Sequence, residues 1–215
     1  MFLLKPSFKI EGFYMDNPCD MERIGRVCYK SEDRITEGSA EKFIKARLGA
    51  HESVIEHSAL TVRFICDRGV THELVRHRLC SFSQESTRYC NYFGRLTFII
   101  PPWIDIPEGD LYRFEDGKQW YGTNKPVYEW YMSLVYASMA YEELLNLGWS
   151  PQQARSVLPN SLKTEIIMTA NFREWRHVFR LRCDKAAHPQ MQELMRPLLT
   201  KVKTHIPIIF DDITF

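Results

Sequence analysis

The sequence lacks the glycine-rich loops with which many nucleotide-binding proteins hold phosphate groups. Its 10 glycines are scattered, and neither GxGxxG nor GxxxxGK[ST] occurs. There is no CxxC pair among the 6 cysteines, and their spacing fits no zinc site. A bound nucleotide would therefore depend on side chains to hold its phosphates. We interpret the cysteines as reduced thiols and expect no metal.

Excess charge and long apolar runs are also absent. The formal net charge is +1, from 28 basic and 27 acidic residues, which argues against a general nucleic-acid binder. No apolar run approaches the length of a membrane span, and the apolar start of the chain is too short for a signal peptide. We expect a soluble cytoplasmic protein with neither nucleic acid nor membrane as partner.

The length and composition are those of a globular domain. At 215 residues, with 45% hydrophobic and 26% charged residues, the chain suits one domain over residues 1–215. Helical patterns outnumber strand patterns, and strand–helix units do not alternate as in a doubly wound sheet. The predicted fold class is α+β, with helices packed on a small, mainly antiparallel sheet.

Periodicity predicts the individual elements. Alternation with period two predicts strands at 60–65 and 96–100. Caps and apolar stripes predict helices, with expected N-caps at Asp20, Ser39, Asn124 and Ser150. The expected helical segments are 20–29, the segment after Ser39, 70–77, 126–147, the segment from Ser150 to before Pro159, 162–182 and 189–203. Residues 103–124 are rich in Asp, Gly, Pro and aromatics, which predicts a long loop insertion.

One short run concentrates basic groups. Arg76-His77-Arg78 is followed after seven residues by Ser86 and then by Arg88. The planar guanidinium fork meets phosphate oxygens in pairs, so the run indicates a site for an anionic, planar ligand. The alternative is that these arginines form surface ion pairs.

Two other readings of polar residues are weaker. Ser86 with His77 as base would suggest a nucleophile, but GxSxG and SxxK are missing, and a hydroxyl that binds ligand or backbone is the better interpretation. His51 and His57, with the glutamates between them, would suggest a metal. Their spacing is not HExxH, and we expect none.

A second basic cluster covers 171–182. Arg173 and His177 are four residues apart, so a helix places them on one face. Arg182 follows Arg173 by nine residues, half a turn out of phase on a straight helix. Either the helix ends before Arg182, or the two arginines serve different ligands or subunits. The alternative for the whole cluster is a solvated basic face.

The run Arg76-His77-Arg78, seven residues, then Ser86 resembles the signature of the flavin-dependent thymidylate synthases. Other segments resemble that family in the same order. They are 49–57, 154–159, 171–173 and 182–190. The likeness spans roughly residues 20–200.

The resemblance implies reductive methylation of dUMP to dTMP for dTTP biosynthesis. It implies FAD as cofactor, 5,10-methylenetetrahydrofolate as carbon donor and NADPH as reductant. It also implies a homotetramer whose active sites are shared between subunits. No enzyme nucleophile is needed, because reduced flavin handles the carbon transfer and supplies the hydride.

The resemblance also implies roles for individual residues. FAD would be held by Ser53, Arg76, His77, Arg78, Gln84, Asn171, Phe172, Arg173 and His177. The dUMP ligands would be Glu73, Leu74, Val75, Arg76, Gln84, Glu85, Ser86, Thr87, Arg88, Arg155 and Arg182. His51 would lie near flavin and folate. Arg182 is the expected catalytic residue, since a cation beside uracil stabilises the charge that lets C5 attack.

Three positions depart from the family pattern. Ser83 stands where Asn is common, Gln84 where Glu is also common, and Glu73 where Gln is common. A carboxylate at Glu73 would repel a nucleotide phosphate. Two other classes of function remain open, a nucleotide- or RNA-binding module without chemistry and a serine hydrolase. Steep salt dependence of polynucleotide binding would mark the first, and labelling of Ser86 by a phosphonate would mark the second.

Overall fold

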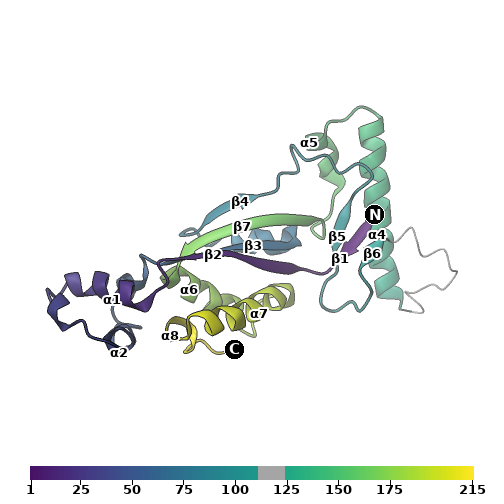
Figure 1. Cartoon of the computed structure of the whole chain (residues 1–215). Helices are drawn as coiled ribbons and strands as arrows, with labels where there is room; N and C mark the ends of the chain where they lie inside the picture. The colour runs from purple at the N-terminus through teal and green to yellow at the C-terminus, as the bar shows by residue number, and fades with distance from the viewer. Residues whose placement is uncertain (111–123) are drawn as a thin grey trace. The chain divides into compact units, whose positions relative to one another are not determined.

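The computed structural model describes residues 1–110 and 124–215 (Figure 1). The chain divides into two compact units, each built from three separate stretches of sequence. Unit 1 contains Met1–Ser7, Phe64–Leu74 and Ser83–Ile166. Unit 2 contains Phe8–Arg63, Val75–Phe82 and Ile167–Phe215.

A four-stranded sheet supplies the longest strands, in the order β2-β3-β7-β4. The bounds are β2 Ser7–Tyr14, β3 Ala59–Asp67, β7 Lys163–Asn171 and β4 Ser81–Gln84. The sheet is mainly antiparallel, which confirms the predicted α+β class. β3 confirms the strand expected at 60–65, and buried residues alternate along it because one face packs on the core.

Strand β7 corrects a prediction. The segment 162–182 was expected to be helical throughout, but only α6, Phe172–Arg182, is a helix. Buried and half-buried residues alternate along all nine positions of β7, with Thr164, Ile166, Met168 and Ala170 buried. This period of two defines a strand, and the helical periodicity begins only after Asn171.

The N-terminal strands were not predicted. Strand β1, Phe2–Leu4, pairs parallel with β5, Thr97–Ile99, and antiparallel with β6, Gly109–Asp110. β5 confirms the strand expected at 96–100. β1 and β6 are too short for period-two alternation to be recognised in the sequence.

Helix α4, Lys125–Asn146, is the longest element of unit 1 and confirms the helix expected at 126–147. It lies beside the β5-β1-β6 sheet (Figure 1) and packs through Leu134 and Tyr141 against a core that includes Leu3 and Phe98. Asn124 is the N-cap residue, but its side chain makes no capping hydrogen bond.

The described part of unit 1 also contains three short elements: α3 Arg68–Leu74, α5 Pro151–Ala154 and the 3-10 turn Arg155–Val157. The capping box expected at Ser150 is present, because Gln153 Oε1 accepts from the backbone N–H of Ser150 at 2.9 Å. The helix predicted at 70–77 begins and ends earlier, so the Arg76-His77-Arg78 run follows it.

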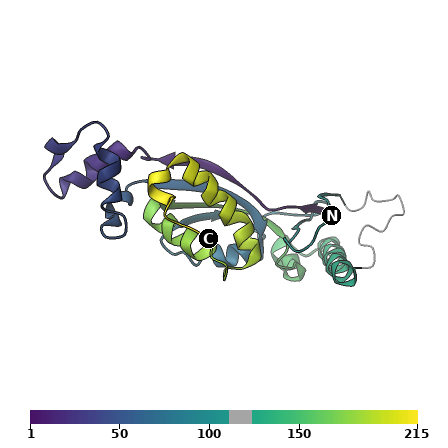
Figure 2. The same cartoon turned by 90° about the horizontal axis from the view of Figure 1, so that it is seen from below.

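Unit 2 packs α6 and α7, Pro189–His205, on one face of the sheet (Figure 2). Its other helices are α1 Pro18–Val27, α2 Ser39–Lys45 and α8 Pro207–Phe210, with 3-10 turns at Glu32–Arg34 and Glu52–Ile55. The caps expected at Asp20 and Ser39 were wrong by a few residues. Asn17 caps α1, and Gly38 occupies the N-cap of α2 with φ 74°.

The long loop expected at 103–124 is only partly described. Residues 103–108 have no regular structure, 109–110 form β6, and 111–123 lie outside the described residues. In the part of the chain that the structure describes, no helix has both the length and the apolar character needed to cross a membrane.

Candidate functional site

The arginines of the first basic run have no acidic partners. Arg76 and Arg78 follow α3 and are exposed. The Arg88 guanidinium lies 5.4 Å from the centre of the Tyr89 ring. None of the three forms an ion pair with a described residue, so surface ion pairing does not explain them. Exposed guanidinium groups without carboxylates are available to an anionic ligand.

His77 between them is buried and bonded. Its side chain is 5% exposed, and Arg182 Nε donates to His77 Nε2 at 3.0 Å. Glu174 Oε1 lies 3.6 Å from Nδ1, and the His177 ring lies edge-on with centroids 5.8 Å apart. Burial, then the charges of Arg182 and His177, lower the pKa of His77 to about 4. The imidazole is therefore neutral at pH 7, and its Nε2 lone pair orients Arg182.

Helix α6 brings the second basic cluster into the same unit. Asn171 caps it by accepting from the backbone N–H of Glu174 at 2.9 Å. The helix continues to Arg182, which excludes the prediction that it ends earlier and leaves Arg173 and Arg182 on different faces. Arg173 pairs with Glu56, with Nη1 2.6 Å from Oε1.

A pocket of about 520 Å³ lies along this part of α6. Its lining residues are Glu52, Glu56, Leu79, Asn171, Arg173, Glu174, His177 and Arg180. The structure thus brings together three of the predicted flavin ligands: Asn171, Arg173 and His177. His51 and Ser53 come from the segment that supplies the two glutamates, but they are exposed and do not line the pocket.

The side chains of two predicted ligands are in the core. Leu74 and Phe172 are both 0% exposed, and the Phe172 ring packs edge-on against Phe210 with centroids 5.5 Å apart. Any ligand contact of these residues would have to be through the backbone. Val75 is 42% exposed, and Glu73 lies in the last turn of α3.

Three possible metal ligands gather next to this pocket. Atoms of His77, Glu174 and His177 lie within 4.8 Å of one another. The Arg182 guanidinium bonded to His77 opposes a cation at that place. Burial raises the pKa of Glu174, and the positive charge of His177 lowers it in part.

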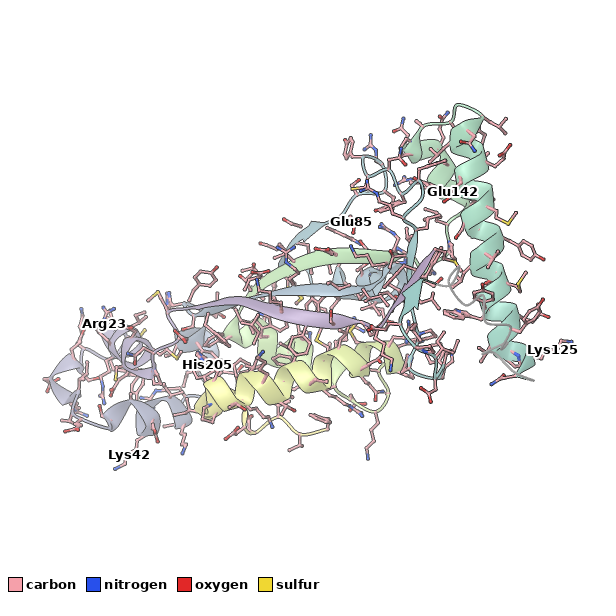
Figure 3. The ribbon with its side chains drawn as sticks, turned by 45° about the vertical axis from the view of Figure 1, so that its right-hand side comes forward. Arg23, Lys42, Glu85, Lys125, Glu142 and His205 are labelled. Carbon is pink, nitrogen blue, oxygen red and sulfur yellow. The ribbon has the colours of Figure 1, made fainter. Side chains whose placement is uncertain are left out.

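In unit 1, the segment after β4 is anchored by two side chains. Gln84 Nε2 donates to Thr71 Oγ1 at 3.0 Å and to Thr164 Oγ1 at 3.3 Å. Glu85 is labelled in Figure 3. Its carboxylate accepts from Tyr92 Oη at 2.9 Å and from Lys163 Nζ at 3.0 Å. This anchoring role of Glu85 was not predicted, because Lys163 is distant from it in sequence.

Glu85 also joins this segment to β7 through the backbone. Its N–H donates to Glu165 O at 2.9 Å, and its carboxylate accepts from Glu165 N at 3.2 Å. The next residue, Ser86, accepts from the backbone N–H of Arg88 at 3.3 Å. This local bond agrees with a hydroxyl that serves backbone or ligand, and His77 is bonded to Arg182 instead.

A second pocket of about 430 Å³ is also part of unit 1. Arg155 Nη1 donates to Thr87 Oγ1 at 3.1 Å, so two predicted dUMP ligands meet there. The pocket is lined by Arg68, Thr87, Gln152, Arg155, Ser156, Leu158, Pro159, Asn160 and Leu162. Arg68 was not predicted, because no motif of the sequence contains it.

The predicted dUMP ligands are divided between the two units. Gln84–Arg88 and Arg155 belong to unit 1, whereas Arg76 and Arg182 belong to unit 2. Of the predicted flavin ligands, only Gln84 lies in unit 1.

Comparisons with known proteins agree on one family. The family model described as "Thymidylate synthase complementing protein" (Thy1) matches residues 13–208. A flavin-dependent thymidylate synthase of Pyrococcus furiosus is 33% identical over 183 residues, which cover 83% of this chain and 68% of that protein. The enzyme of the same name from Corynebacterium diphtheriae is 31% identical over 221 residues, which cover 96% and 82% of the two chains.

A solved structure has the same fold. It is the UMP/dUMP methylase PolB from Streptomyces cacaoi, bound with 5-Br dUMP. The TM-score is 0.80 at 22% identity, over 98% of this chain and 96% of that one. From the family match and the relatives together, this chain belongs to the family of thymidylate synthase complementing proteins, whose curated relatives are flavin-dependent thymidylate synthases.

Proposed function

We propose that this chain is a flavin-dependent thymidylate synthase, which methylates dUMP to dTMP with FAD as cofactor. The observation that carries the proposal is the set of exposed arginines without acidic partners, Arg76, Arg78 and Arg88, in a chain of this family. Phosphates need cationic side chains here because the sequence has no phosphate-binding loop.

The residues fit a bound flavin. The pocket of about 520 Å³ along α6 falls within the usual range of cofactor sites, about 300–1,000 Å³. Asn171, Arg173 and His177 line it, and Arg76 and Arg78 supply cations from the same unit. When bound, reduced FAD supplies the hydride and handles the transferred carbon, for which protein side chains are unsuited.

Arg182 has the chemical role in this proposal. C5 of uracil is a weak nucleophile, and its attack becomes possible when enolate-like negative charge builds up on the ring. A guanidinium fixed beside the ring stabilises that charge, and removal of one such preorganised donor typically costs about 3–4 kcal/mol. The neutral His77 ring holds the Arg182 Nε at 3.0 Å, so the guanidinium does not have to reorient during the reaction.

The phosphate end of dUMP is assigned to unit 1. Ser86, Thr87 and Arg88 follow the segment that Glu85 and Gln84 fix to β7 and α3. Arg155 joins them through its bond to Thr87. Methylenetetrahydrofolate is the proposed carbon donor and NADPH the proposed reductant. Neither the carbon transfer nor the reduction requires a serine nucleophile.

Two measurements test this function. The purified protein should be yellow, with flavin absorbance near one FAD per chain. With dUMP, methylenetetrahydrofolate and NADPH it should form dTMP, and omission of any one should abolish the product. A colourless protein that takes up no FAD would contradict the proposal. Polynucleotide affinity with steep salt dependence, without NADPH oxidation, would favour a binding module instead.

A further inference from the structure

The pocket of about 430 Å³ in unit 1 has one sign of charge. Arg68 and Arg155 line it, and its other lining residues are neutral. A concave surface with two guanidinium groups and no carboxylate attracts anions. The pocket along α6 differs, because three glutamates line it together with its bases.

Arg68 has no partner for its charge. It is half-buried, its Nη1 is buried, and that atom has no hydrogen-bond partner among the described residues. Two other arginines of low exposure are paired: Arg26 lies 2.6 Å from Glu22, and Arg176 lies 2.6 Å from Asp212. Arg47 also has a buried nitrogen, Nε, without a hydrogen-bond partner among the described residues, but its guanidinium lies over the rings of Tyr29 and Phe43. A buried guanidinium atom without an acceptor is destabilising, and in Arg68 it belongs to a side chain that lines a pocket able to attract anions.

The backbone fixes where Arg68 stands. It is the first residue of α3, and its N–H donates at 2.9 Å to the carbonyl of Asn160, another lining residue. Arg155 belongs to the 3-10 turn Arg155–Val157, which is distant from Arg68 in the sequence. Its Nη1 donates to Thr87 Oγ1 at 3.1 Å. The two arginines therefore come from different elements and converge on one cavity.

We infer that Arg68 is an additional ligand of the substrate phosphate, which it holds together with Arg155. The ligand class is a phosphate monoester dianion, which the positive charges of Arg68 and Arg155 attract from the lining of the pocket. This assignment rests on the proposed function, because it takes the 5′-phosphate of dUMP as the anion. Arg68 binds substrate here and takes no part in the transfer chemistry at the base.

The test compares ligands with and without phosphate. The dissociation constants of dUMP, deoxyuridine and inorganic phosphate are measured by calorimetry on the flavin-loaded protein and on Arg68→Gln. We expect dUMP binding to weaken about 10- to 100-fold, as for loss of charge-assisted hydrogen bonds, with deoxyuridine unchanged. Arg95→Gln is the matched control, since it removes one positive charge from unit 1 at an exposed residue whose side chain donates to the Asn91 carbonyl.

Thermal unfolding without ligand distinguishes a ligand-binding role from a structural one, because loss of a residue that stabilises the fold would lower the melting temperature. Because Arg68 is unpaired, Arg68→Gln should leave the melting temperature unchanged or raise it. Inorganic phosphate and dUMP should then raise the melting temperature of Arg68→Gln less than that of the unchanged protein. Should Arg68→Gln fail to fold, Arg68→Lys keeps the charge but not the fork and is measured instead.

The outcomes separate this inference from the proposed function. Unchanged dUMP affinity in Arg68→Gln, or equal loss for deoxyuridine and dUMP, would overturn the inference while the enzyme assay still stands. A protein that binds no dUMP at all would contradict the function. The rise in melting temperature with inorganic phosphate would then decide the inference. Loss of that rise in Arg68→Gln would support the inference, and an unchanged rise would reject it.

Discussion

At the scale of the residue, four arginines of this chain show two different situations. Arg63 and Arg176 pair with Glu11 and Asp212, and both pairs are 2.6 Å apart. Arg76 and Arg78 have no acidic partner among the described residues. In the first group, the buried Arg176 needs an opposite charge, and the partly exposed Arg63 joins β3 to β2 through Glu11. For the second group, a bound anionic ligand would supply the missing negative charge.

Arg78 and Arg182 should fail in different ways. Arg78→Ala should purify with little flavin, because it removes an exposed cation expected to hold the cofactor. Arg182→Ala should keep its flavin and lose dTMP formation by about 100- to 1,000-fold, as for loss of a preorganised donor. The visible spectrum and the product assay measure the two effects separately. Equal flavin loss in both variants would contradict this division of roles.

His77 makes the stability of the ligand-free protein depend on pH. Its pKa falls from 6.5 to about 4 on folding, so between these values the unfolded chain binds more protons. Its contribution is complete above pH 6.5 and is lost as pH falls toward 4, by up to about 3 kcal/mol. Urea denaturation at several pH values should show this loss in the unchanged protein.

Two variants isolate that effect. His77→Gln should flatten the pH dependence of the free energy of unfolding below pH 6.5. His57→Gln removes an exposed histidine and should leave the pH dependence as it was. If both variants behave alike, His77 is not the group responsible.

The sequence allowed candidate residues to be chosen by their type and spacing, but not by the contacts that they make in the fold. The signature run and Asn171, Arg173 and His177 could be found because their types and spacing are local. Arg68 and Glu85 could not, because what makes them notable is the presence or absence of partners far along the chain. Glu85 bonds Lys163, and Arg68 stands beside Asn160, pairs that only the fold brings together.

At the scale of the element, length alone did not decide what was predictable: α4 and the short β5 were predicted, whereas β2, with eight residues, and β7, with nine, were not. Helix α4 matches its prediction within one residue at each end because its apolar stripe covers 22 residues. β7 was misassigned because its nine residues lead directly into α6, and the apolar residues of the two elements were read as one period. In the folded structure, burial of every second residue identifies β7 as a strand and not as part of the helix.

Close packing at Gly25 sets the spacing between α1 and its neighbours. A Cβ there would lie 2.7 Å from Phe43 Cε1 and 2.9 Å from Val54 Cγ2. Gly25→Ala should therefore lower the free energy of unfolding by about 1–2 kcal/mol, since overpacking outweighs the better helix propensity of alanine. Gly12→Ala is the control, because its Cβ would meet nothing closer than 3.5 Å. Urea midpoints that do not differ between the two would contradict the packing argument.

At the scale of the whole molecule, the division of the predicted ligands bears on assembly. We expect a homotetramer in which unit 1 of one subunit and unit 2 of another complete each active site. Arg155 lies in unit 1 and Arg182 in unit 2, so this expectation predicts that their variants can complement each other.

Mixing inactive variants tests this arrangement. Arg155→Ala and Arg182→Ala should each be inactive, but co-expressed they should recover about one quarter of the sites if subunits assort at random. Arg155→Ala with Arg88→Ala should recover none, because both changes lie in unit 1. Mixtures that stay inactive, with oligomers of the expected mass, would mean that each chain builds its own site.

The interleaving of the two units also governs how the chain folds. Unit 1 needs residues from Met1 through Ile166, and unit 2 needs residues from Phe8 through Phe215. Neither unit can close on the ribosome until most of the chain has emerged, and β1 must wait for β5 across more than ninety residues. Such distant pairing slows folding and leaves strand edges exposed in the meantime. Truncation or a single proteolytic cut inside the interleaved region should therefore release no folded half.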